Sequence, residues 1–74
     1  RLGAAQTSVA AARTAREAAE AAYESRLAQL RAGHATTAEL FAAEGQLNAA
    51  RFAELDAAVQ LQLARTQLDY AIGD

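Results

Sequence analysis

The sequence predicts an all-α fold, an antiparallel helical hairpin in which two long helices pair as a coiled coil. Three observations support this prediction. The 74 residues include no proline and consist largely of strong helix formers such as Ala, Leu, Arg, Glu and Gln. Gly33 divides the chain into two stretches of such residues, and a helix start signal follows it within a few residues. Apolar and small residues recur at alternating spacings of three and four on both sides of it.

The first helix is expected to span about residues 3–32 and to stop at Gly33. A residue just past a helix end usually adopts a left-handed conformation, which glycine reaches without steric cost. At about 1.5 Å per residue, such an arm measures on the order of 45 Å, which is long for a globular helix. Helices of this length are typical of coiled coils and helical barrels.

The tip is expected at residues 33–36, and the second helix at 37–72. Thr36 and Glu39 have the spacing of a capping box, in which the Thr hydroxyl accepts from the Glu amide and the carboxylate accepts from the Thr amide. A loop this short forces the two helices to lie side by side and antiparallel.

Each arm carries one seam of a left-handed coiled coil. The first seam comprises Leu2, Ala5, Val9, Ala12, Arg16, Ala19, Tyr23, Arg26 and Leu30. The second comprises Leu40, Ala43, Leu47, Ala50, Glu54, Ala57, Leu61, Ala64 and Leu68. Folding about the tip pairs positions whose numbers add to 69 or 70. Layers of large residues then alternate with layers of small ones, as closely spaced helices require.

The same register places Arg16 opposite Glu54, the central polar position of each seam. We expect an ion pair between the two arms that helps to fix the register. The alternative is that both long side chains extend independently into solvent.

The second arm carries another apolar line, which we expect to be turned by about 100° from its seam. It comprises Phe41, Phe52, Leu55, Val59, Leu63 and Tyr70. One partner helix cannot cover both lines. The first arm similarly offers a flank of small residues, namely Ala4, Ser8, Ala11, Ala15, Ala18, Ala22 and Ser25. We therefore predict self-association through the second line, which also suits a thin core, since 23 residues are alanine.

The composition argues against several kinds of chemistry. Cysteine is absent and His34 is the only histidine, which removes thiolate and multi-histidine metal sites; neither a cofactor nor catalysis is expected. His34 is expected in an exposed loop, and Thr36 and Thr37 are expected to cap the helix. Seven arginines are dispersed among nine acids, without the basic stripe that nucleic acid requires. Every apolar stretch is interrupted, so no transmembrane helix is expected.

Glu17, Glu20 and Glu24 share one helical face and leave three interpretations open. They form a solvated face with local partners in Arg13 and Arg16, or a carboxylate site for a cation. If the hairpin lines a channel, they favour cations in its lumen.

A string of residues around the tip has a pattern of its own. It comprises Leu30, Gly33, Thr36, Glu39, Leu40, Phe41, Ala43, Glu44, Leu47 and Ala50, and continues through Ala57 and Leu68 to Ile72 and Gly73. In this pattern the chain resembles TolC-like outer-membrane efflux proteins, and the Ala-rich heptads of the first arm resemble them more loosely.

The resemblance implies that residues 1–74 are one helical hairpin cut from a larger periplasmic helical barrel. Such a barrel is a trimer in the cell envelope of a Gram-negative bacterium, and it conducts passively, without enzyme activity or cofactor. The hairpin tip would dock the hairpins of a periplasmic adaptor protein. The docking residues implied are Leu30, Gly33, His34, Thr36, Thr37 and Glu39.

Two other interpretations remain open. The chain also resembles the α-hairpin of the adaptor (membrane fusion) proteins, through Arg26, Leu30, Thr36 or Thr37, and Glu39. Phe41 stands where we expect an acid in an adaptor. The third interpretation is a structural coiled-coil hairpin with no role in transport.

Overall fold

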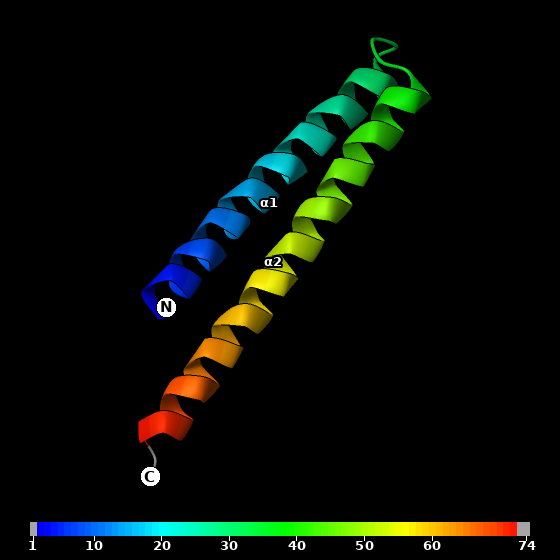
Figure 1. Cartoon of the computed structure of the whole chain (residues 1–74). Helices are drawn as coiled ribbons and strands as arrows, with labels where there is room; N and C mark the ends of the chain where they lie inside the picture. The colour runs from blue at the N-terminus through cyan, green and yellow to red at the C-terminus, as the bar shows by residue number, and fades with distance from the viewer. Residues whose placement is uncertain (1, 73–74) are drawn as a thin grey trace.

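The fold is a two-helix antiparallel hairpin (Figure 1). A computed structural model describes residues 2–72, which form α1 (Leu2–Arg31) and α2 (Thr37–Ile72). The molecule is a rod of 62 × 14 × 12 Å, and α2 continues past the first turn of α1 at the end opposite the tip. The all-α prediction is confirmed, with helix ends within one residue of those expected. Gly73, the last residue of the family-like string, lies outside the described residues.

The turn after α1 is a Schellman motif, in which backbone amides bond back to the last turn of the helix. The amide of His34 donates to the carbonyl of Gln29 at 2.7 Å, and that of Gly33 donates to Leu30 at 3.0 Å. Gly33 has a φ of 82°, in the left-handed region. This confirms Gly33 as the residue that ends α1, because side chains are strained in that conformation.

The start of α2 is the predicted capping box. The Glu39 amide donates to the Thr36 hydroxyl at 3.1 Å, and the Thr36 amide donates to the Glu39 carboxylate at 2.8 Å. The Leu40 amide then donates to the Thr36 carbonyl at 3.1 Å, the first turn of the helix. Together with those of Gly33 and His34, five backbone amides in and beside the short connection between the helices are hydrogen-bonded.

The core of the hairpin is the single interface between α1 and α2. Every seam position from Leu2 to Leu30 and from Leu40 to Ala64 is buried or half-buried. Of the residues that the structure describes, only Leu47 and Ala57 are buried outright, at 5% and 9% exposure. Leu68, expected opposite Leu2, is 43% exposed, because few residues of α1 remain to cover that end of α2.

The second apolar line of α2 lies on the side of the helix that faces away from α1, not at about 100° from the seam. Phe52 stands two residues from both Ala50 and Glu54, which corresponds to about 200° around a helix of 3.6 residues per turn. Its side chain is 73% exposed. We call this line the outward face of α2. Its members, Phe41, Phe52, Leu55, Val59, Leu63 and Tyr70, are between 51% and 79% exposed.

Gly33→Ala is expected to destabilise the hairpin by about 1 kcal/mol, because the left-handed conformation costs an L-residue roughly that much. The added Cβ meets no atom within 4 Å, so the cost is conformational. Gly45→Ala is the matched control. Gly45 lies inside α2 with equally open surroundings, and alanine there should stabilise the helix by up to about 1 kcal/mol. Denaturant melts followed by circular dichroism should give opposite signs for the two variants, and equal signs would contradict this account of the tip.

Candidate functional site

Three surfaces of the hairpin are candidates for function, and the tip is the first. His34, Thr36 and Thr37 are exposed there, whereas Leu30 is half-buried between the helices. Arg26 ties the end of α1 to the start of α2, since its guanidinium lies 3.9 Å from the Glu39 carboxylate and donates to Gln29 at 3.0 Å. The register expected from the heptad spacing does not pair Arg26 with Glu39. The tip is thus a small, braced surface with a histidine and two hydroxyls at its end.

Electrostatics at the tip centre on Glu39. The pKa of Glu39 is held below its ordinary value, chiefly because its carboxylate accepts the hydrogen bond of the Thr36 amide. The nearby charge of Arg26 lowers the pKa of Glu39 further. The carboxylate is therefore used within the tip, as the acceptor that holds the start of α2.

The middle of the seam contains a polar cluster around Arg16. Its Nε donates to Glu54 of α2 at 2.9 Å, and its Nη1 donates to Glu20, four residues along α1, at 2.7 Å. Hydrogen bonds to Glu54 and then to Glu20 raise the pKa of Arg16 above its ordinary value. Arg13 lies 3.9 Å from Glu54 as well, and not in the local pair with Glu17 that the spacing suggested. The contact between the arms expected for Arg16 and Glu54 is thus present in the structure.

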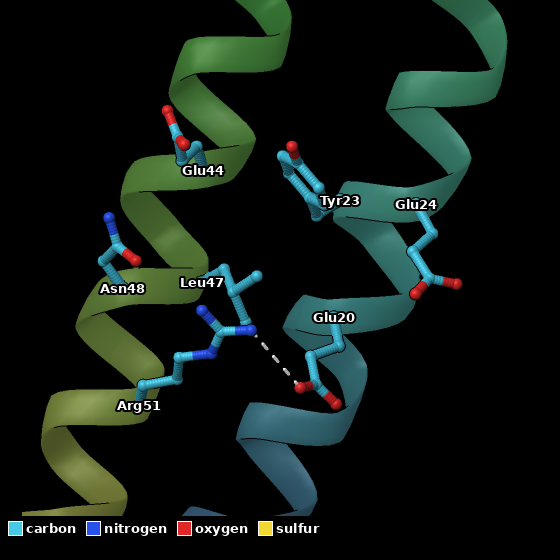
Figure 2. A pocket seen from close by; sticks show the side chains of 7 residues that line it. All are labelled: Glu20, Tyr23, Glu24, Glu44, Leu47, Asn48 and Arg51. Carbon is cyan, nitrogen blue, oxygen red and sulfur yellow. Dashed lines mark ion pairs between the residues drawn. The ribbon is translucent and has the colours of Figure 1, made fainter.

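A hollow of about 210 Å³ lies beside this cluster, toward the tip (Figure 2). Tyr23 and Leu47 face one another between the two helices, as the register predicted. Across the hollow, Arg51 lies 3.6 Å from Glu20. The hollow is lined by Glu20, Tyr23, Glu24, Glu44, Leu47, Asn48 and Arg51. Three of these side chains are carboxylates, and the Arg51 guanidinium lies beside the Glu20 carboxylate.

The outward face of α2 is the third candidate surface. An open hollow of about 170 Å³ lies on this face and is lined by Phe52, Leu55, Asp56 and Val59. Large aromatic and aliphatic side chains so exposed are typical of a surface that binds another molecule.

Across the described residues, no three His, Asp or Glu side chains are arranged to hold a metal ion. In the same part of the chain, neither helix has the length of apolar sequence needed to cross a membrane. No protein-family model, curated protein or solved structure matches the chain.

The Arg16–Glu54 pair predicts energetic coupling between the two arms. Arg16→Ala and Glu54→Ala should each lower the melting temperature, and the double variant should lose less than the two losses combined. The coupling should weaken in high salt, because the pair is only partly shielded from solvent. The control is the same cycle with Arg65→Ala and Glu54→Ala, in which the double variant should lose as much in melting temperature as the two single variants combined. Additive losses for Arg16 and Glu54 would show that the two side chains act independently.

The capping box predicts an acid-sensitive contribution to stability. Because the folded-state pKa of Glu39 is lowered, the ionised carboxylate stabilises the fold above the ordinary glutamate pKa of about 4.3. That contribution is lost as the pH falls through the lower folded-state pKa. Glu39→Gln keeps an acceptor but cannot ionise, so it should melt below the parent chain near neutral pH and approach it in acid.

Thr36→Val distinguishes the contribution of the Glu39 carboxylate to stability from that of the Thr36 hydroxyl. It retains the backbone amide that lowers the Glu39 pKa but removes the hydroxyl cap, so it should lose about 1 kcal/mol without losing the acid dependence. Melting curves of the parent chain and of both variants are compared between pH 3 and 7. This range extends about one unit below and about three units above the ordinary glutamate pKa. Parallel pH profiles for the parent and Glu39→Gln would show that Glu39 does not supply this dependence.

Proposed function

We propose that this hairpin is a wall element of a larger helical assembly, in which neighbouring hairpins cover the outward face of α2. One observation carries the proposal. The six large side chains of that face are at least half exposed, while α1 covers the opposite side of the same helix. A helix with apolar surface on two opposite sides suits a layer of helices in which it has a neighbour on each side.

The assembly we propose is the periplasmic tunnel of a TolC-like outer-membrane efflux channel in a Gram-negative cell envelope. The string from Leu30 to Ala50 supports this assignment, together with the length of the rod and the small tip between its two arms. In this role the protein is a trimeric passive conduit. It works by how its helices pack, and no bond of the transported compound is made or broken.

The tip is the proposed docking site for a periplasmic adaptor hairpin. His34, Thr36 and Thr37 offer hydrogen-bonding groups to a partner at the end of the rod. Gly33 and Glu39 hold the backbone that presents them, and the carbonyl of the half-buried Leu30 accepts the hydrogen bond of the Gly33 amide. Because the tip is braced by its own hydrogen bonds, docking requires little ordering of this chain.

The first part of the test is assembly. Sedimentation should show a mass that rises with protein concentration. A double variant in which both Phe52 and Leu63 are replaced by Gln should be closer to a monomer. Both side chains are exposed and lie away from α1, so helicity should be retained. A stably folded monomer at all concentrations would contradict the wall role.

The second part is docking. A photo-crosslinking residue in place of His34, in the protein expressed from its own gene, should capture a periplasmic adaptor. One in place of Gln60, which lies in α2 far from the tip, should not. Capture of an outer-membrane channel at His34 would instead identify this chain as the adaptor hairpin. Capture of neither component would leave a structural coiled-coil hairpin with no role in transport.

A further inference from the structure

We infer that the outward face of α2 packs against α1 of a second copy, on the seven small residues that we call the small-residue face of α1. These residues are Ala4, Ser8, Ala11, Ala15, Ala18, Ala22 and Ser25. The inference rests on the proposed wall role and specifies which surfaces meet, namely α2 of one hairpin and α1 of the next. The alternative occupant of the outward face is α2 of the second copy.

The exposed apolar area is the first argument for a second copy. Six large side chains, each contributing on the order of 100 Å², offer roughly 600 Å² along α2. A stable protein interface takes about 800 Å² from each partner, so this face together with its rim is of the right size. A single hairpin leaves this area exposed, and among the described residues its own core contains two buried side chains, those of Leu47 and Ala57.

The second argument is the match in size between the two faces. All seven residues of the small-residue face are exposed, none is charged, and they follow one another at spacings of four and three. The charged residues Arg13, Glu17 and Glu24 lie on another side of α1. A surface of alanine and serine lets a neighbouring helix approach closely, and large side chains then fill the space between the two backbones.

The register of the two faces also matches. Inside one hairpin, the numbers of facing positions add to about 70, and the same sum would apply between two hairpins that lie side by side with no shift along their axes. Val59 then meets Ala11, Leu55 meets Ala15 and Phe52 meets Ala18. Three successive large residues of the outward face thus coincide with three alanines of the small-residue face.

A contact between two α2 helices fits less well. A two-fold pairing would place large side chains against large ones and leave the small-residue face of α1 uncovered. The α2-to-α1 contact is instead heterologous, so each added copy presents a fresh α2 face, and the association continues or closes into a ring.

Charge substitutions on α1 test the inference directly. Ala15→Glu should reduce self-association in sedimentation as strongly as Leu55→Glu, although Ala15 is not on α2. Ala10→Glu is the matched control, since Ala10 is an exposed alanine on the charged side of α1, and it should leave association unchanged. All three substitutions are at exposed helical positions, so circular dichroism should show full helicity.

Disulfide trapping identifies the two faces that meet. Chains carrying Val59→Cys and chains carrying Ala11→Cys are mixed and oxidised, and the mixed disulfide should exceed the share that random pairing gives. Gln60→Cys with Ala11→Cys is the control and should show no excess. A predominance of disulfides between two Val59→Cys chains, or normal association of Ala15→Glu, would overturn the inference while leaving the wall role intact. A parent chain that remains monomeric would overturn both.

Discussion

The structure depends on one constraint: two helices share one interface, so each can bury a single stripe of its surface. The stripe that α2 turns toward α1 contains its buried residues, Leu47 and Ala57. Much of that interface is alanine, and burying a methyl group contributes only about 0.8 kcal/mol. The apolar residues that do not fit into this interface, such as Phe52, remain on the opposite side of α2. Both the thin core and the exposed outward face follow from this constraint.

The alignment of the two helices is set at the tip and again halfway along the rod. At the tip, the left-handed Gly33 ends α1 and the Thr36–Glu39 box begins α2, so the chain reverses within one short connection. Halfway along, Arg16 bonds to Glu54 across the interface. A shift of one helix by a turn would separate this pair and place large layers against small ones. Local capping and long-range pairing therefore support the same register.

The three candidate surfaces differ in what they offer to a partner. The tip places hydroxyls and a histidine at the end of a rod, the outward face offers apolar area along its length, and the hollow beside Tyr23 holds carboxylates that are partly paired with arginine. In a wall of hairpins the outward face would be covered by a neighbour and the tip would stay free. This division would let one small element serve both assembly and docking.

The sequence by itself determined the local features. Gly33, Thr36 and Glu39 each act through backbone within a few residues, so the helix ends and the capping box could be predicted, and the heptad spacing placed Arg16 opposite Glu54. Only the tertiary structure decided the other contacts between charged side chains. Arg51 lies near Glu20, Arg26 lies near Glu39, and Arg13 lies near Glu54 and not near Glu17. The outward direction of the second apolar line follows from helix periodicity once the seam is known, and the structure shows that α1 leaves this line exposed. Long side chains reach across a coiled coil only when the spacing between backbones allows, and here the packed alanine layers of both helices set that spacing.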